Sequence, residues 1–311
     1  MTAKRREALA GYLFLAPNAA GFLVFSLIPI GMAFVLTFTE WGLVGPQRFV
    51  GIDNYTAALQ DPLFWKAVRN TVYFSVGTVP IAVVIAFFLA LLLNRAVRGL
   101  VVFRTAVFLP YVTLTVAIAT VWMWIYNPDV GILNYLLSLV GIDGPNWLAD
   151  ATWAMPALVL MSNWRGIGYP TLIFLAALQT IPQDYFDAAK VDGANWFQRV
   201  RYVIVPMVSP ATFFIFVTSF IGTMQAFDQF YIMTKGGPAF STTTIVYYVY
   251  QNAFAFSKMG YASTLAFFLF CLIFVVTAMQ WRMGRRWVHG EPAGGHAGAR
   301  LARPRGQSGV Q

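Results

Sequence analysis

The sequence predicts an all-α membrane protein with six transmembrane helices, and the first observation behind this is its composition. Of its 311 residues, 59% are hydrophobic and 11% are charged, whereas about 25% of residues are charged in typical soluble domains. The mean hydropathy of +0.64 agrees with this. The second observation is that long apolar stretches recur along the chain. The third is that the basic residues lie between these stretches instead of clustering on one solvated domain, so their excess does not indicate a nucleic-acid partner.

The counts of cysteine and histidine exclude several kinds of site. The chain has one cysteine, Cys271, and two histidines, His289 and His296, both in a polar tail. A disulfide framework, a Cys/His zinc cluster and a catalytic scheme with several histidines are therefore excluded.

Six stretches are long enough to span a membrane, because a helix needs about 20 apolar residues to cross a hydrocarbon core of about 30 Å. The first continues well beyond the roughly 7–15 residues of a cleavable signal, so we expect it to be retained. Residues 244–256 are apolar but too short to span, and we expect them at the membrane surface. The predicted spans are residues 9–38, 70–93, 101–126, 153–178, 208–233 and 261–283.

Two segments flank these spans. Residues 1–8 form a short N-terminal segment, and residues 284–311 form a tail that is rich in Gly, Pro, Arg and Ala. The tail has too little apolar surface to fold, so we expect it to be disordered.

The distribution of Lys and Arg predicts which side of the membrane each loop faces, because cytoplasmic loops collect basic residues. The two termini, the loop after the second span and the loop after the fourth span hold 15 basic residues, whereas the other loops hold 5. The remaining basic residue, Arg165, lies inside the fourth span. Both termini are therefore expected in the cytoplasm.

The cytoplasmic loop between the fourth and fifth spans, residues 181–206, is more patterned than a simple connector. Pro182 suits the first turn of a helix, and Asp187 suits the positive end of the helix dipole. Gly193 is expected to end this helix at about Val191, because glycine accepts the left-handed conformation found at helix C-termini.

A second short helix is expected to follow in the same loop. Asn195 and Gln198 have the spacing of a capping box, and the helix is expected to end before Pro206. A surface hairpin that rests against the membrane fits the same pattern. On the first helix, four residues share one face at helical spacing and form a flat patch for a partner: Tyr185, Ala188, Ala189 and Asp192.

A motif in this loop resembles a known one. It reads Asp187-Ala188-Ala189, three residues, Gly193, nine residues, Val203, one residue, Val205-Pro206. This resembles the EAA loop of ABC importer inner-membrane subunits, in which EAA is followed by three residues, G, nine residues, I, one residue, L and P. Asp replaces the leading Glu, and Val replaces both aliphatic residues, so the chemical types are kept.

Other runs resemble the carbohydrate-type subgroup of these permeases, the maltose and glycerol-3-phosphate class, and the resemblance covers roughly residues 10–285. The runs are Tyr12 to Pro17, Phe49 to Tyr55, Phe103 to Thr105 with Leu109-Pro110, and Gly236 to Pro238 with Thr242 to Thr244.

The resemblance implies a non-catalytic subunit that forms one half of a pore and carries a sugar or sugar-like polar solute. The family's EAA loop forms a coupling helix on a cytoplasmic ATPase dimer, which binds ATP and Mg²⁺. A second, homologous permease subunit and an extracytoplasmic solute-binding protein complete the system, in the cytoplasmic membrane of a bacterium or archaeon. The residues implied in ATPase coupling are Tyr185, Asp187, Ala188, Ala189, Asp192, Gly193 and Pro206.

The absence of a phosphate-binding loop agrees with this implication. The sequence has no Gly-x-x-x-x-Gly-Lys-Ser/Thr pattern, so the chain itself binds no nucleotide by that motif. No cofactor is expected in this chain.

Charged residues inside a membrane span are costly and are candidates for function. Arg165 lies in the fourth span and Asp228 in the fifth. A sugar site combines such charges with amides and aromatic rings, so we expect five residues to line the substrate path: Asn163, Trp164, Arg165, Gln225 and Asp228. An ion pair between helices, or a contact between subunits, explains the two charges equally well.

Two rival functions remain at this point. A self-sufficient secondary transporter or channel would use ion gradients and need no ATPase. An intramembrane enzyme is the weaker rival, because the sequence has neither a His-Glu-x-x-His nor a Gly-x-Ser-x-Gly pattern.

Overall fold

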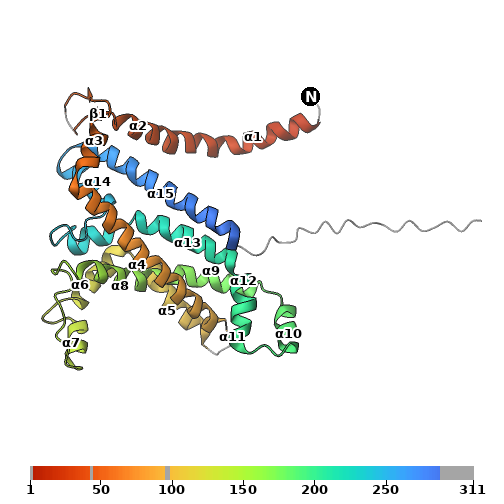
Figure 1. Cartoon of the computed structure of the whole chain (residues 1–311). Helices are drawn as coiled ribbons and strands as arrows, with labels where there is room; N and C mark the ends of the chain where they lie inside the picture. Colours follow the sequence, from red (N-terminus) through yellow and green to blue (C-terminus); the bar gives the residue numbers. More distant parts are fainter. Residues whose placement is uncertain (1–2, 43–44, 95–98, 288–311) are drawn as a thin grey trace, which may run out of the picture.

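The computed structural model describes residues 3–42, 45–94 and 99–287, and it is almost entirely helical (Figure 1). Three helices of the described chain are long and apolar enough to cross a membrane, and two bent helix pairs raise this number to five. The prediction of an all-α membrane protein is confirmed. Most of the tail predicted to be disordered, residues 288–311, lies outside the described residues.

The first apolar helix is largely exposed along its length. It consists of α1 (Ala3–Phe22), the π-helical turn η1 (Leu23–Leu27) and α2 (Ile28–Leu36). α2 packs against the last helix, α15 (Met259–Trp287), whereas α1 extends away from the bundle (Figure 1). A short hairpin follows, in which β1 (Thr39–Glu40) pairs antiparallel with β2 (Arg48–Phe49).

The longest helix, α4, lies at the centre of the bundle. It follows the short helix α3 (Asp53–Gln60), runs over Pro62–Leu93 and packs against α8, α9 and α13. Fully buried alanines on its faces, including Ala67, Ala86 and Ala90, allow the neighbouring helices to approach closely.

Asp61 fixes the N-terminal end of α4. One of its carboxylate oxygens accepts a hydrogen bond from the Leu63 N–H at 2.8 Å, which caps the helix. The other accepts hydrogen bonds from the hydroxyls of Tyr248 at 2.5 Å and Tyr261 at 3.0 Å. This carboxylate therefore joins three helices at one end of the molecule.

The third and fourth predicted spans are broken helices. α5 (Leu100–Val112) and α6 (Thr115–Ile125) meet at 99°. After the short helix α7 (Ile132–Ser138), α8 (Ala154–Gly166) and α9 (Gly168–Gln179) are separated at Ile167, and each is shorter than a full span. Pro110 in α5 and Pro170 in the first turn of α9 lie beside these breaks. Proline favours a break because it has no backbone N–H to donate to a helical hydrogen bond.

The fifth predicted span, 208–233, differs in its outer half. α13 covers Ser209–Met224 and bends by 64° from the preceding helical segment. The backbone is irregular at Gln225, Ala226 and Phe227 and becomes helical again before the π-helical turn η3 (Phe230–Thr234). Irregular backbone is tolerated at membrane depth where it lines a cavity, and this segment does so.

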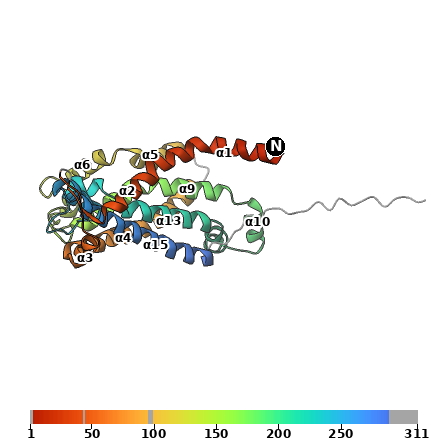
Figure 2. The ribbon, with the colours of Figure 1, turned by 90° about the horizontal axis from the view of Figure 1, so that it is seen from above.

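The apolar segment that we expected at the membrane surface is folded onto the bundle. It forms α14 (Ile245–Tyr250) and the π-helical turn η4 (Gln251–Ala255), which pack against α4 and α15. Ile245 and Tyr248 belong to a buried cluster that also includes Leu265 of α15. Figure 1 and Figure 2 place this end of the bundle, with α3 and α6, opposite the end that carries α10.

Candidate functional site

The predicted cytoplasmic loop forms the helical hairpin that its sequence indicates. α10 covers Gln183–Val191 and ends at Asp192, and Gly193 has a φ of 74°. Asn195 and Gln198 form the expected capping box, with the Gln198 N–H donating to the Asn195 side chain at 2.9 Å and the Asn195 N–H donating to the Gln198 side chain at 2.7 Å.

The second helix of the loop continues further than we predicted. α11 (Trp196–Arg199), η2 (Val200–Ile204) and α12 (Val205–Met207) form one helical segment that includes Pro206. The prediction that the helix ends before Pro206 is wrong. Pro206 lies in the first turn of α12, a position where a missing N–H is tolerated.

α10 exposes the face that the sequence assigns to a partner. Of its four residues, Tyr185, Ala188 and Asp192 are exposed and Ala189 is half-buried, and no residue of α10 is fully buried. Beyond this face, Val191 is 88% exposed. In the following segment Phe197 and Tyr202 are also largely exposed, so the hairpin presents apolar side chains that nothing in the described chain covers.

Asp187 is held within α10. Its carboxylate forms an ion pair with Lys190 at 2.8 Å and accepts a weaker hydrogen bond from Gln183 at 3.4 Å. The hydrogen bond from Lys190, and then that from Gln183, lower the pKa of Asp187 below its ordinary value of 3.8.

Phe186 connects α10 to the body of the protein. It packs against a cluster of buried residues that includes Ile181 and Ile204 at the loop. The same cluster contains Phe174 of α9 and Ala90 of α4. Contiguous packing therefore joins α10 to two helices that also line the cavity described next.

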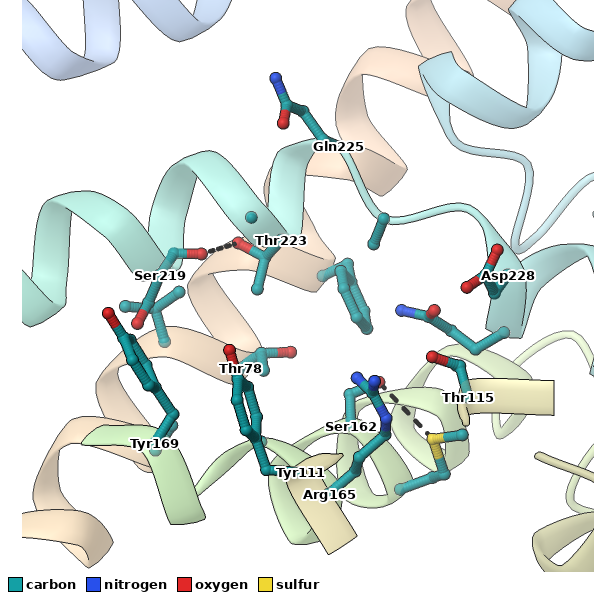
Figure 3. Close-up of a pocket in the computed structure, with 18 of the residues that line it drawn as sticks. Thr78, Tyr111, Thr115, Ser162, Arg165, Tyr169, Ser219, Thr223, Gln225 and Asp228 are labelled. Carbon is teal, nitrogen blue, oxygen red and sulfur yellow. Dashed lines mark hydrogen bonds between the residues drawn. The ribbon is translucent and has the colours of Figure 1, made fainter. Parts of the chain in front are cut away.

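A cavity of about 470 Å³ lies between α4, the bent pair α5–α6, the α8–α9 hinge and α13 (Figure 3). Its size is within the range of about 300–1,000 Å³ for small-molecule sites. Its polar and aromatic lining residues include Thr78, Tyr111, Thr115, Ser162, Arg165, Tyr169, Ser219, Thr223, Gln225, Phe227 and Asp228.

The charges of this cavity have no partner of opposite charge. Among the described residues, only Lys190 and Asp187 form an ion pair within 4 Å, so Arg165 and Asp228 do not pair with each other. In the described chain, the Nε atom of Arg165 and the hydroxyl of Thr78 are also buried without a hydrogen-bond partner. Buried polar groups normally find a partner, so these two atoms are exceptions at the edge of the cavity.

Two tyrosines form one aromatic wall. The rings of Tyr111 and Tyr169 stack with centroids 5.2 Å apart and planes 16° from parallel. Figure 3 shows them side by side near Thr78. The cavity thus combines stacked aromatic rings, hydroxyl groups, one guanidinium and one carboxylate.

Comparison with known protein families matches residues 66–289 to the binding-protein-dependent transport system inner membrane component family. This stretch contains both the EAA-like loop and the cavity. The chain belongs to this family. The chain is thus a multi-pass permease protein of the inner membrane.

Individual relatives agree with this assignment. The permease is 36% identical over 292 residues to the probable ABC transporter permease protein YesP of Bacillus subtilis, covering 92% of this chain and 94% of the relative. It is 37% identical over 289 residues to the lactose transport system permease protein LacF of Rhizobium radiobacter, covering 91% and 96%.

A solved structure shows the same fold. It is the crystal structure of a bacterial alginate ABC transporter in complex with an alginate pentasaccharide-bound periplasmic protein. One of its chains matches this permease with a TM-score of 0.78 and 23% identity, covering 91% of this chain and 96% of that chain.

The structure brings three of the five predicted path residues to the cavity. Arg165, Gln225 and Asp228 line it, although the side chain of Gln225 points away from the others in Figure 3. Asn163 and Trp164 are not among its lining residues. Asn163 is buried and donates to the Val159 carbonyl at 3.0 Å, and Trp164 is half exposed and packs against Trp122.

The sequence did not predict most of the small polar and aromatic residues that line the cavity of the permease. Ser162, Arg165 and Tyr169 recur every three or four residues, as do Ser219 and Thr223 on α13. This helical spacing of polar residues within apolar spans is the signal that would have found them.

Proposed function

We propose that this permease carries a sugar or a similar hydroxyl-rich solute across the inner membrane in an importer driven by a separate ATPase. The observation that carries the proposal is the cavity that is lined both by Arg165 and Asp228, which have no ion-pair partner, and by the stacked rings of Tyr111 and Tyr169.

The chemistry of a sugar fits this lining. A sugar hydroxyl both donates and accepts hydrogen bonds, so it accepts from the guanidinium of Arg165 and donates to the carboxylate of Asp228. The apolar C–H face of a sugar ring packs on the tyrosine rings, which carry a negative face and a positive edge. The relative LacF, whose name refers to lactose transport, supports the same class of solute.

The proposed source of energy is a cytoplasmic ATPase dimer that binds ATP and Mg²⁺ and docks on α10. The exposed face of Tyr185, Ala188 and Asp192 supports this, as does the highly exposed Val191 at the end of the helix. Phe186 and the buried cluster at its side supply a contiguous packed route from α10 to α4 and α9. The coupling roles of Ala189, Asp192, Gly193 and Pro206 are part of this proposal.

Two further partners complete the proposed importer. A second, homologous permease subunit forms the other half of the pore, and an extracytoplasmic binding protein delivers the solute to the end opposite α10. Membership of the binding-protein-dependent family supports both.

Uptake assays test the role of the cavity. Proteoliposomes that hold the complete complex and its binding protein are supplied with labelled lactose, maltose or trehalose. Arg165→Gln and Asp228→Asn are each expected to reduce uptake at least tenfold, since each removes a charged hydrogen bond worth about 1.5–3 kcal/mol. Asp143→Asn, an exposed carboxylate outside the cavity, is the matched control. Wild-type uptake by both cavity variants, with normal assembly, contradicts the proposal.

A further inference from the structure

Four aromatic rings form a continuous series beside the cavity. We call Phe227, Tyr231, Tyr250 and Phe254 the aromatic ladder. The centroid distances are 5.4 Å from Phe227 to Tyr231, 5.2 Å from Tyr231 to Tyr250 and 5.4 Å from Tyr250 to Phe254. Phe227 also lies 5.1 Å from Tyr250. Each neighbour is thus within the distance at which aromatic rings interact.

The ladder does not belong to the buried core. η3 packs into the core through Phe230 and Met233, and α14 does so through Ile245 and Tyr248. The ladder rings are not part of these clusters, although three of them lie 6.3–6.5 Å from the buried ring of Tyr247 on α14. Tyr231 is 41% exposed and Phe254 is 61% exposed. Part of the aromatic surface of the ladder is therefore accessible from outside the described chain.

The ladder leads from the surface into the cavity. Phe227 lines the cavity next to Asp228. Phe254, at the other end, lies in η4, which follows α14 at the end of the bundle opposite α10 (Figure 1). Phe254 is the most exposed ring of the ladder, Tyr250 and Phe227 are partly buried, and Tyr231 between them is 41% exposed.

We infer that the aromatic ladder is an entry site that binds the apolar faces of pyranose rings and leads a saccharide from the outer surface into the cavity. This inference rests on the proposed function. The negative face of an aromatic ring attracts the C–H face of a sugar without reading its hydroxyl pattern. Several weak sites in series suit passage, because a solute must leave each site as readily as it enters.

The hydroxyl groups of the ladder support this assignment. The side chains of Tyr231 and Tyr250 hydrogen-bond each other, which places hydroxyl groups beside the aromatic faces, as a sugar path needs. Tyr231 and Tyr250 supply them in the middle of the ladder, and Asp228 supplies a carboxylate directly after Phe227.

Site-specific fluorine labels test the ladder in the complete complex. Phe254 is replaced by 4-fluorophenylalanine, which keeps the ring, and Phe256 is replaced in the same way in a control protein. Phe256 is 58% exposed and lies two residues further on, with no ring contact in the described chain. The complex is held in lipid nanodiscs, because maltoside and glucoside detergents present the same pyranose faces as the probe.

Maltopentaose, which carries five pyranose rings, is the probe, and mannitol, which has hydroxyls but no ring, is the control solute. The ¹⁹F resonance at position 254 is expected to shift with maltopentaose and not with mannitol, and the resonance at 256 is expected to stay. Tyr250→Leu is expected to weaken the response about two- to tenfold, the effect of one aromatic contact. No shift at 254, or equal shifts at 254 and 256, overturns the inference.

The two proposals fail in different ways. If Arg165→Gln and Asp228→Asn lose uptake while position 254 does not respond, the ladder is wrong and the cavity stands. If position 254 responds while both cavity variants transport normally, the proposed role of the cavity is wrong.

Discussion

The ring of Tyr111 in α5 stacks on the ring of Tyr169 in α9, with centroids 5.2 Å apart and planes 16° from parallel. Tyr111 lies just before the sharp bend between α5 and α6, and Tyr169 lies just after the hinge between α8 and α9. The stack therefore joins two broken helices at the wall of the cavity. The stack is a structural contact, and under the proposed function it is also a surface for a solute.

Loss of this stack is expected to affect transport more than stability. Tyr169→Leu removes an aromatic pair worth about 0.5–1.5 kcal/mol beyond its buried area, so thermal unfolding of the complex should shift modestly. Uptake should fall several-fold, because the cavity loses one of its aromatic faces. Tyr135→Leu, at an exposed position in α7, should leave both measurements unchanged. Equal effects of the two variants on uptake would contradict this role for Tyr169.

Gly168 permits the close approach of α9 to α5. A Cβ atom at this position would lie 2.6 Å from the carbonyl oxygen of Val107 and 3.0 Å from the Cα of Phe108. Gly168→Ala is therefore expected to destabilise the protein by about 1–3 kcal/mol, the usual cost of overpacking. At Gly166, on the other side of the hinge, nothing lies within 4 Å of such an atom. Gly166→Ala should be neutral or stabilising by about 0.5–1 kcal/mol in the same unfolding assay.

The sequence predicted a helix well where a local pattern, such as an apolar run or a set of turn residues, is enough to specify it. The apolar run that forms α4 and the turn residues of the α10 hairpin each specify local structure by themselves. The bend between α5 and α6 and the irregular segment at Gln225 were not predicted. Both depend on which backbone groups a neighbouring cavity or helix can satisfy, and a single-helix pattern does not contain that information.

The conformation of Gly193 provides a test of the α10 hairpin. Its φ of 74° lies in the left-handed region, which costs a residue with a side chain about 1–2 kcal/mol. No atom lies within 4 Å of a Cβ built there, so substitutions act through the backbone. Gly193→Val should uncouple ATP hydrolysis from uptake, whereas Gly193→Asn, which tolerates this conformation better, should retain more uptake. Equal uptake by the two variants would contradict a role for the backbone conformation of Gly193 in coupling.

The ion pair of Asp187 predicts a pH dependence of α10. The hydrogen bond from Lys190 lowers the pKa of Asp187, so the charged form stabilises the folded helix above the ordinary pKa of 3.8. This stabilisation is lost as pH falls through the lowered value. Hydrogen exchange should show constant protection of α10 from about pH 5 to 8 and weaker protection below the ordinary pKa. In Lys190→Met the Asp187 pKa, measured by NMR, should rise, and an unchanged pKa would contradict the pairing.

The candidate site was predicted in part for a similar reason. Arg165 and Asp228 stand out in a sequence because charges are rare in membrane spans. Thr78 and Tyr169 are ordinary residues for such helices, and only the packing of α4 against α8 and α9 shows that they face the same cavity. Trp164, adjacent to Arg165, packs instead against Trp122, since successive helical residues point about 100° apart.

The dependence of uptake on ATP is the most direct test of the central claim, that this permease works as the membrane part of an ATP-driven importer. The complex is purified from its native membrane, placed in proteoliposomes with its binding protein, and supplied with a labelled sugar that it carries. We predict uptake only with a co-purified ATPase and internal Mg²⁺-ATP. Uptake by this chain alone, driven by an imposed ion gradient without ATP, would contradict the account and indicate a secondary transporter.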